Sequence, residues 1–334
     1  MRGDGDIANT GPAAHIEMLR ERLDGYLADL AESKEPKTLY EPVKQVLTSK
    51  GKRLRPLLTI LTAEAFGVEP TVSMPGAAAV EVFHNFTLVH DDIMDQSASR
   101  RGQPTVHVTW GAPAGILSGD FLLGMSYELL SRLPPANVKP ALACFSTMVV
   151  RLCEGQALDA EFETSNEVAV AEYLDMVSRK TGALLVASLQ IGGIVGGSGE
   201  EHLRVLGEAG HHLGLAFQIQ DDLLDLTADA ESWGKPIGAD LMAGKRAFLL
   251  LKAIEMDGAG DDRWFRRLME RGGLDSSEIE EAKASMERLG VLESTRTIIL
   301  REYGKALDAL DSVSPDVSLR GVRWIIEKMK TRIQ

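Results

Sequence analysis

The sequence has little of what marks secreted or disulfide-linked proteins. Two cysteines occur among 334 residues, aromatic residues make up 5%, and Met1–Asp6 contains no apolar stretch. Cys144 and Cys153 fall in one expected helix, about 13 Å apart at a rise of 1.5 Å per residue, which is too far for a disulfide. We therefore expect buried free thiols, a cytoplasmic location and no signal peptide.

Long hydrophobic runs and strand signals are also scarce. The longest uncharged run, Gly182–Gly199, holds six glycines, two serines and Gln190, which favours a tightly packed buried helix over a membrane span. The only β-like alternation is Val106–Trp110, with no Asn-Gly or Asp-Gly hairpin signal beside it. The net charge of -13 argues against nucleic acid or an anionic membrane surface as the main partner.

Helical periodicity dominates what is present. Apolar residues recur at three- and four-residue steps before Pro36, at Ile16, Leu19, Leu23, Leu27 and Leu30. Asp275 and Glu278 form a capping-box signature, and Gly290 is placed to end the helix that follows. Residues 1–12 are polar and glycine-rich, which predicts a disordered tail. Residues 13–334 show no linker or composition break, so we predict a single all-α domain.

Two aspartate clusters are the most informative feature. Each follows an apolar segment, the first with Asp91, Asp92 and Asp95, the second with Asp221, Asp222 and Asp225. Helical spacing places the first and last aspartates of each cluster on one face, where like charges repel unless a cation neutralises them. An all-carboxylate set favours Mg²⁺ over Zn²⁺. A single cluster could equally be a solvated helix end or an acidic cap, but two copies favour metal binding.

Basic groups supply the other half of a diphosphate site. They occur in Gly51–Pro56, at Arg100-Arg101, at Lys180-Thr181, and at Lys235 and Lys245. Singly each suits a solvated surface charge, whereas together they indicate metal-bound carboxylates for one diphosphate and arginine and lysine side chains for another. His84, two turns before Asp91, is either a core residue or a phosphate donor. Gln218 can face the second cluster, and His211-His212 receives no role.

These blocks, in this order, resemble the motifs of the trans-polyprenyl diphosphate synthase family, which includes farnesyl and geranylgeranyl diphosphate synthases. The resemblance runs from about Leu39 to Leu250 and rests on Gly51–Pro56, Glu81–Thr105, Lys180–Gly182, Phe217–Asp222 and Gly234–Asp240. It implies a single large antiparallel helical bundle around a central cavity, of the isoprenoid synthase type, in a homodimer. It also implies an enzyme that condenses isopentenyl diphosphate head to tail with dimethylallyl, geranyl or farnesyl diphosphate through an allylic cation.

The resemblance also implies residue roles. Asp91 and Asp95 would hold two Mg²⁺ ions and Asp221 a third, while Asp92, Asp222 and Asp225 would hold ligands or waters in place. Arg100, Lys180 and Lys235 would bind the allylic diphosphate. Gly51, Lys52, Arg55, His84 and Arg101 would bind isopentenyl diphosphate. Thr181 and Gln218 would turn oxygens toward the allylic cation. Arg246-Ala247 follows Lys245 where the family usually has Thr or Ser at the second position, so the substrate-binding role of Lys245 stays open.

Product length is expected to depend on the helix before Asp91. Phe83 and Thr87 lie below Asp91 on that helix, and Phe86 lies five residues before it. By resemblance Thr87 and Phe86, four and five residues before Asp91, form the usual floor of the chain pocket, and Phe83 is added from its place on the helix. The aromatic at five, the small residue at four and the lack of an insertion in Asp91–Asp95 resemble a geranylgeranyl (C20) producer, with farnesyl and longer products as alternatives. Phe83 and Phe86 could instead be plain core residues. A class I terpene cyclase and a non-catalytic partner subunit are the rival functions.

Overall fold

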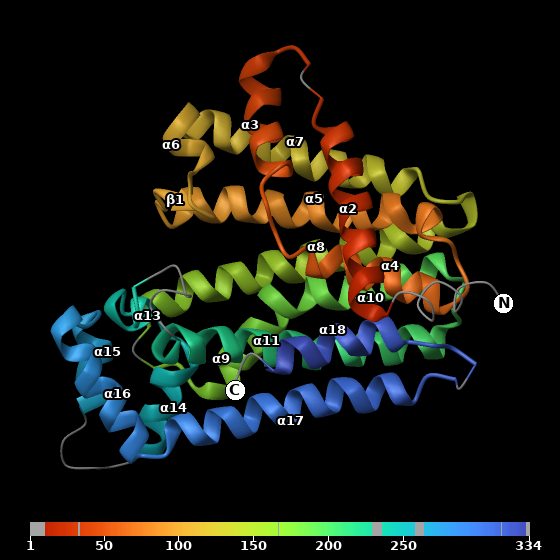
Figure 1. The fold of residues 1–334 in the computed structure, drawn as a ribbon. Coiled ribbons are helices and arrows are strands. Elements are labelled where there is room, and N and C mark those ends of the chain that lie inside the picture. The colour runs from red at the N-terminus through yellow and green to blue at the C-terminus, as the bar shows by residue number, and fades with distance from the viewer. Residues whose placement is uncertain are drawn as a thin grey trace. The chain divides into compact units, whose positions relative to one another are not determined.

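The computed structural model describes residues 11–32, 34–165, 167–228, 236–257, 264–314 and 316–331. These residues are mostly helical (Figure 1), which confirms the all-α prediction. Most of the predicted tail, residues 1–10, lies outside the described residues. The described elements are α2 (Pro12–Leu30), α3 (Lys37–Leu47), α4 (Leu54–Ala65), α5 (Pro70–Met94), β1 (Ser99–Arg100), β2 (Gln103–Pro104), α6 (Val106–Trp110), α7 (Ala112–Ser131), α8 (Pro135–Thr164), α9 (Val170–Val177), the π-helix η1 (Ser178–Gly182), α10 (Ala183–Val195), α11 (Glu200–Thr227), α13 (Ala239–Met242), α14 (Phe248–Asp257), α15 (Trp264–Arg271), the 3₁₀ turn η2 (Ser276–Glu278), α16 (Ile279–Arg288), α17 (Val291–Asp311) and α18 (Arg320–Lys330).

The chain forms two compact units, each assembled from separated segments. The first unit comprises Met1–Ser146, Ala187–Gly207 and Val313–Ile325. The second unit comprises Thr147–Val186, Glu208–Ser312 and Ile326–Gln334. Neither unit is a contiguous half of the sequence, and the expectation of one domain over residues 13–334 stays a prediction.

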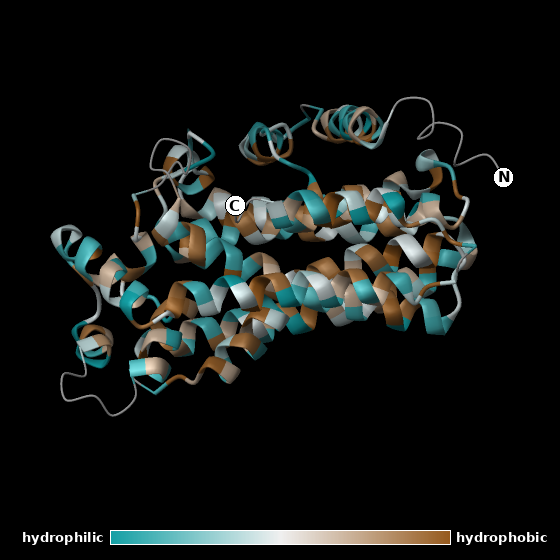
Figure 2. Cartoon of the chain, turned by 60° about the horizontal axis from the view of Figure 1, so that its bottom comes forward, coloured by the Kyte–Doolittle hydropathy of each residue, from teal (hydrophilic) through white to brown (hydrophobic). Residues whose placement is uncertain are grey.

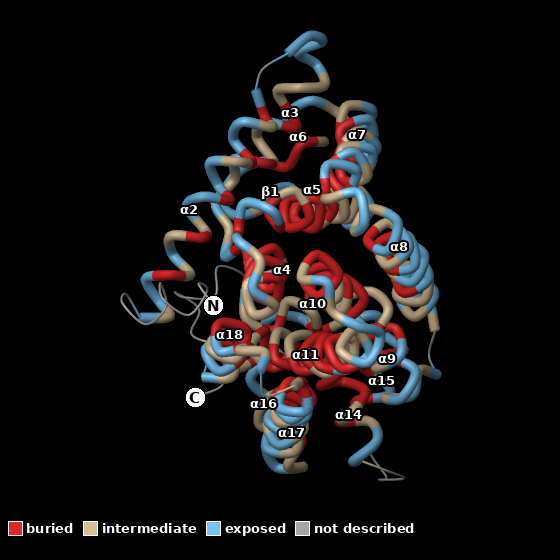
Figure 3. Tube along the Cα trace, turned by 90° about the vertical axis from the view of Figure 1, so that its right-hand side faces the viewer, coloured by how far each residue is buried: buried red, intermediate tan, exposed pale blue. Residues whose placement is uncertain are grey.

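The first unit is built around α5, which packs against α4 and α7. Glycines on α7 let the two helices approach closely, because a Cβ added at Gly119 would lie 2.1 Å from Nε2 of His90. Figure 3 shows α7 with buried residues toward α5 and exposed residues on the opposite side. In Figure 2 hydrophobic and hydrophilic residues mix along most helices, as expected where one face of a helix is buried.

The glycine-rich run predicted as a buried helix forms α10. A Cβ added at Gly192 would lie 2.5 Å from the carbonyl oxygen of Thr59 on α4, so the backbones of α10 and α4 nearly touch. The Thr59 hydroxyl donates a hydrogen bond of 2.9 Å to the carbonyl of Ser188. Among the described residues, no helix combines the length and apolar character that a membrane crossing requires. The prediction of a tightly packed buried helix is confirmed.

In the second unit, α11 is fixed by buried polar contacts. The side chain of Gln220 accepts a hydrogen bond of 2.6 Å from the hydroxyl of Tyr303 on α17 and donates one of 3.0 Å to the carbonyl of Met329 on α18. The predicted capping box is confirmed, because Glu278 accepts from the backbone nitrogen of Asp275 at 2.9 Å. Gly290, with φ of 75°, follows the end of α16 as predicted.

Despite their alternating pattern, residues Val106–Trp110 do not form a strand, in agreement with the all-α prediction. These residues form the short helix α6, and the strand pair lies just before it, with Arg100 opposite Gln103. The turn between the strands places Arg101 at φ of 53° and Gly102 at φ of 75°, both left-handed. An Arg-Gly turn lacks the usual Asn-Gly or Asp-Gly signature, and two-residue strands are too short to show alternation.

Both cysteines lie on α8 and are free thiols, as predicted. Cys144 is half-buried, and burial raises the pKa of its thiol to about 12. Cys153 is exposed, so the prediction that both thiols are buried was wrong for this residue. It lies three residues after the exposed Val150, on the solvent face of α8.

Candidate active site

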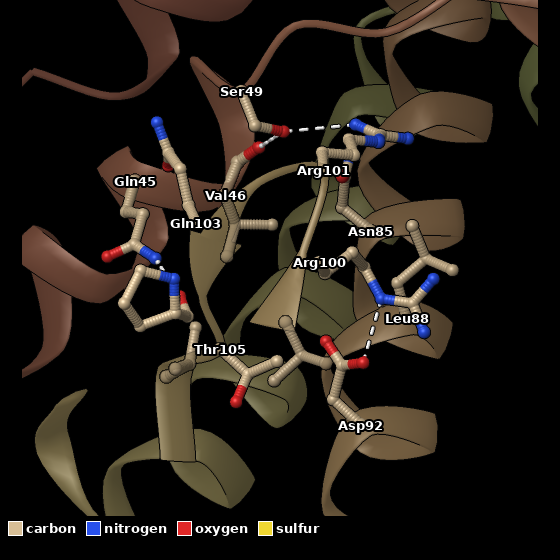
Figure 4. Close-up of a pocket in the computed structure, with 13 residues that line it drawn as sticks. Gln45, Val46, Ser49, Asn85, Leu88, Asp92, Arg100, Arg101, Gln103 and Thr105 are labelled. Atoms are coloured by element: carbon tan, nitrogen blue, oxygen red, sulfur yellow. Dashed lines mark hydrogen bonds and ion pairs between the residues drawn. The ribbon is translucent and has the colours of Figure 1, made fainter. Parts of the chain in front are cut away.

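The first aspartate cluster closes α5 in the first unit. Asp91 is half-buried, Asp92 is buried and Asp95 is exposed. Oδ1 of Asp92 accepts a hydrogen bond of 2.8 Å from Nε of Arg100 (Figure 4). Burial raises the pKa of Asp92, and the neighbouring Arg100 opposes that rise. Asp92 is therefore the most buried aspartate of the cluster and is bonded by Arg100, and Asp91 and Asp95 keep more exposed surface.

The β1–β2 turn brings Arg101 to the loop before α4. Nη1 of Arg101 donates a hydrogen bond of 3.0 Å to the hydroxyl of Ser49. A Cβ added at Gly51 would lie 3.2 Å from that same nitrogen, so a larger residue there would displace the guanidinium by a few tenths of an ångström. The structure thus brings together Gly51 and Arg101, two residues predicted to bind one substrate. Arg100, Arg101 and Asp92 also line a cavity of ≈ 50 Å³ (Figure 4).

His84 lies beside these arginines. Nη1 of Arg55 donates to Nε2 of His84 across 3.3 Å. Burial lowers the pKa of His84 well below its ordinary value, and the positive charges of Arg55 and Arg101 lower it further. The imidazole is therefore neutral at pH 7, and the surrounding guanidinium groups form a positive patch that attracts an anion. Lys52, on the loop before α4, is exposed.

Arg53, the remaining cation of the Gly51–Pro56 motif, has a different role. Arg53 is buried, and its Nη1 lies 2.6 Å from Oε1 of the buried Glu81. Its other nitrogens donate to Asp24 at 2.8 Å and to the Ser49 carbonyl at 2.7 Å. Arg53 therefore anchors the loop rather than a substrate. The sequence signal for this was Glu81, a carboxylate inside an apolar helix, which requires a buried cation.

The residues expected to form the pocket floor lie in an aromatic cluster. Phe83 is fully buried, and its ring centroid lies 5.2 Å from that of Phe86 and 5.1 Å from that of Phe145 on α8. Phe86 is half-buried, and its other neighbour is His90 at 4.8 Å. The Thr87 hydroxyl donates to the carbonyl of His84 at 2.8 Å. Phe86 thus keeps accessible surface, and its ring packs against the fully buried Phe83.

The second aspartate cluster lies on α11 in the second unit. Asp222 is buried and accepts three hydrogen bonds, from the Tyr173 hydroxyl at 2.6 Å, the Phe248 backbone nitrogen at 2.9 Å and Nε2 of Gln218 at 3.0 Å. Burial and the charge of Asp240 raise the pKa of Asp222 to about 7, against the three hydrogen bonds, which lower it. Sequence reasoning missed Tyr173, because a lone tyrosine on another helix carries no motif.

The other two aspartates of the second cluster differ in burial, as the aspartates of the first cluster do. Asp225 is buried and accepts from the backbone nitrogen of Asp240 at 3.1 Å, while Asp221 is half-buried. In both clusters, then, protein groups bond the aspartates predicted to orient ligands. The aspartates predicted to contact metal, Asp91, Asp95 and Asp221, keep accessible surface.

The carboxylates present fit Mg²⁺ bound together with a substrate. Within the described ranges, no group of three or more His, Cys, Asp or Glu side chains could hold a metal ion by itself. Mg²⁺ does not need such a group, because it commonly takes one or two carboxylates and completes its shell with water and phosphate oxygens. A structural Zn²⁺ site, with four protein ligands, would not fit these residues.

Lys180 and Thr181 lie on the π-helix η1, between α9 and α10. Nζ of Lys180 lies 2.5 Å from Oδ2 of Asp159 on α8. The Thr181 hydroxyl donates to Oε1 of Gln218 at 2.9 Å, and Gln218 in turn donates to Asp222. The structure thus joins the predicted residues Thr181 and Gln218 to the second aspartate cluster in one hydrogen-bonded series.

The other predicted lysines give less information. Lys235 lies outside the described residues. Lys245 is exposed, and its backbone nitrogen donates to the Asp240 carbonyl at 2.9 Å. The next residue, Arg246, is buried and donates to the carbonyls of Ser165 and Gly244. The residue between Lys245 and the departure at Ala247 is therefore a structural arginine.

Comparisons with known proteins extend over most of the chain. Residues 36–286 match the profile of the polyprenyl synthetase family. The short chain isoprenyl diphosphate synthase of Methanothermobacter thermautotrophicus is 39% identical over 298 residues, which covers 89% of this chain and 90% of the relative. The geranylgeranyl diphosphate synthase of Sulfolobus acidocaldarius is 37% identical over 295 residues, covering 86% and 89%. The crystal structure of a geranylgeranyl pyrophosphate synthetase from Pyrococcus horikoshii matches with a TM-score of 0.87 at 36% identity, covering 96% of this chain and 97% of that one.

Proposed function

Because this chain belongs to the polyprenyl synthetase family, we propose that it condenses isopentenyl diphosphate head to tail with an allylic diphosphate, giving geranylgeranyl diphosphate. It is a prenyltransferase that elongates prenyl chains, with the isoprenoid synthase fold of its solved relatives. One observation in the first unit supports the proposal that the enzyme binds two diphosphate substrates. Arg55 bonds His84, and Arg101, whose charge also acts on His84, is the chain neighbour of Arg100, which bonds Asp92 at the Asp91–Asp95 helix end.

The two substrates have different binding residues in this proposal. Asp91, Asp95 and Asp221 hold Mg²⁺ ions, three in all by family resemblance. Mg²⁺, when bound, neutralises diphosphate charge as a Lewis acid. Arg100 and Lys180 bind the allylic diphosphate, together with Lys235. The isopentenyl diphosphate binds at the patch formed by Gly51, Lys52, Arg55, His84 and Arg101. A neutral His84 can donate to a phosphate oxygen through Nδ1 while Nε2 accepts from Arg55.

The reaction breaks one carbon–oxygen bond and forms one carbon–carbon bond. The allylic C–O bond ionises, and the electron pair leaves with the pyrophosphate. The double bond of isopentenyl diphosphate attacks the allylic carbon, and the new cation loses a proton to the released pyrophosphate. Arg100 and Lys180 stabilise the charge that grows on the leaving group. The Thr181 hydroxyl donates its hydrogen to Gln218, so its lone pairs remain available to the allylic cation.

Three further features of the protein support the proposal. The half-buried Phe86, backed by Phe83, suits the floor of a C20 pocket. The exposed Ile116 and Leu117 on α7, a helix apolar on most sides, suit an interface with a second copy of the chain. Free thiols at Cys144 and Cys153 suit the reducing cytoplasm.

Product analysis tests the proposal. The purified chain is incubated with Mg²⁺, isopentenyl diphosphate and one of three starters, dimethylallyl, geranyl or farnesyl diphosphate, and the extracted product is sized. We expect C20 product that disappears with EDTA and in Asp95→Asn. Asp308→Asn, at an exposed position of α17 away from every predicted site residue in the sequence, is the matched control and keeps activity. A cyclic hydrocarbon would indicate a terpene cyclase, and no turnover a non-catalytic subunit. C15 product, or product longer than C20, would overturn only the assigned length.

A further inference from the structure

Two adjacent histidines on α11, His211 and His212, have partners on different elements. Their rings lie 5.1 Å apart and are inclined at 66°. Nδ1 of His211 lies 3.0 Å from the hydroxyl oxygen of Ser178, the first residue of the π-helix η1. Nδ1 of His212 lies 2.7 Å from Oε2 of Glu302 on α17. One histidine therefore bonds the segment that carries Lys180 and Thr181, and the other does not.

The segment that His211 contacts has an uncommon backbone. η1 is a single π-helical turn of five residues, inserted between α9 and α10. Such turns are rare because they are less stable than the α-helix, and they persist where tertiary contacts support them, often at functional sites. Lys180 and Thr181 both lie in this turn, so its geometry sets the direction of their side chains.

Two glycines hold the backbone of the same turn. A Cβ added at Gly155 of α8 would lie 2.3 Å from the backbone nitrogen of Lys180. A Cβ added at Gly214 of α11 would lie 2.5 Å from Cα of Gly182. These close approaches restrict the turn from α8 and α11. His211 lies three residues before Gly214 on the same face of α11, and adds a side-chain hydrogen bond to the start of the turn.

His211 is suited to accept that hydrogen bond. Burial lowers the pKa of His211, and the neighbouring His212 lowers it further, so its imidazole is neutral at pH 7. The Ser178 hydroxyl is buried, and it can donate to Nδ1. A buried hydroxyl is costly to leave unbonded, so the pair favours the observed conformation of η1.

We propose that His211 is a positioning residue for prenyl transfer, which, through Ser178, fixes the π-helical turn and thereby the directions of the Lys180 ammonium and the Thr181 hydroxyl. The proposal rests on the proposed function of Lys180 at the allylic diphosphate. Loss of the pair loosens Lys180 without removing its charge. Binding of the allylic substrate is then weakened, whereas isopentenyl diphosphate binds to residues on other elements.

Steady-state kinetics with each substrate varied in turn tests the inference. We expect Ser178→Ala and His211→Leu to raise KM for the allylic diphosphate by roughly fivefold, the effect of about one hydrogen bond, and to leave KM for isopentenyl diphosphate unchanged. His211→Asn places an amide where Nδ1 stands and should restore the wild-type value. His212→Leu is the matched control, because it removes the contact with Glu302 and keeps the contact with Ser178.

The outcomes separate this inference from the proposed function. The positioning role is wrong if Ser178→Ala and His211→Leu lower the melting temperature without raising KM for the allylic diphosphate. It is also wrong if His211→Asn raises this KM as much as His211→Leu does. An equal rise of allylic KM in His212→Leu would also overturn it. Lys180→Ala provides the distinction. If Lys180→Ala keeps the wild-type KM for the allylic diphosphate, both the proposed role of Lys180 and the inference about His211 are wrong. If Lys180→Ala raises this KM but Ser178→Ala does not, only the inference about His211 is wrong.

Discussion

Nη1 of Arg53 lies 2.6 Å from Oε1 of Glu81, and both side chains are buried. Removing one member of a buried ion pair typically costs about 3–5 kcal/mol, because the other charge loses its compensation. After Glu81→Ala, Arg53 keeps a second partner, the partly exposed Asp24, so we expect the free energy of unfolding to fall by about 3 kcal/mol, the lower end of this range, measured by urea denaturation.

An exposed ion pair supplies the control for this prediction. Arg20 and Glu17 pair at the surface of α2, and Glu17→Ala should change stability by less than ~1 kcal/mol. The double variant Arg53→Met, Glu81→Leu should recover part of the loss, because no unpaired charge then stays buried. Equal effects of Glu81→Ala and Glu17→Ala would contradict the structural role assigned to the pair.

Tyr173 donates to Asp222 at 2.6 Å, and this bond predicts an effect on the metal requirement. Hydrogen bonds to charged groups contribute about 1.5–3 kcal/mol, so Tyr173→Phe should leave the Asp222 carboxylate less well held. We expect the Mg²⁺ concentration for half-maximal activity to rise several-fold. Tyr127→Phe, on α7, is the control and should not change it. A normal Mg²⁺ titration of Tyr173→Phe would show that this bond is dispensable.

The accessible surface of Phe86 predicts a change in product length. Phe86→Ala should lengthen the product by at least one five-carbon unit, because the floor then lies deeper, and chromatography of the extracted lipids measures it. Phe121→Ala, whose ring packs against Tyr40 at 5.3 Å on another part of the unit, controls for the loss of an aromatic. An unchanged product from Phe86→Ala would count against the floor assignment.

The difference in exposure between the two thiols predicts their reactivity. The thiolate is the reactive form, so a thiol whose burial raises its pKa to about 12 reacts slowly until the pH approaches that value. At pH 8 iodoacetamide should modify Cys153 in the folded protein and spare Cys144, as read by mass spectrometry. Cys153→Ser should then take up no label without denaturant. Labelling of that variant at the wild-type rate would contradict the burial of Cys144.

Local sequence patterns predicted elements that depend on contacts between near neighbours in the chain. The spacing of Leu19, Leu23 and Leu27 predicts α2, and all three side chains are buried. The capping box at Asp275 and the glycine at 290 were also predicted correctly, because caps form within one turn. The β1–β2 turn was missed because Arg101 adopts a left-handed conformation that its residue type rarely takes.

Candidate site residues were predictable where a motif marks them, but their partners were not. The family resemblance singles out Arg55 rather than Arg53 as a substrate ligand, but no local pattern shows that Arg55 lies beside His84 or that Arg53 pairs with Glu81. Tyr173 and Asp159 bind predicted residues from positions without a motif. A hydrogen bond between residues far apart in sequence leaves no local pattern, so only the folded chain shows it.

The sequence by itself determined the helical class, the two acidic clusters and the order of the basic motifs, since periodicity and charge are properties of consecutive residues. The tertiary structure decided which carboxylates are buried, which arginine is structural, and that His211 contacts the turn of Lys180. These depend on burial, and a side chain is buried by residues that the chain brings from other elements. Desolvation then decides whether a charge is paired inside the protein or left accessible to a ligand.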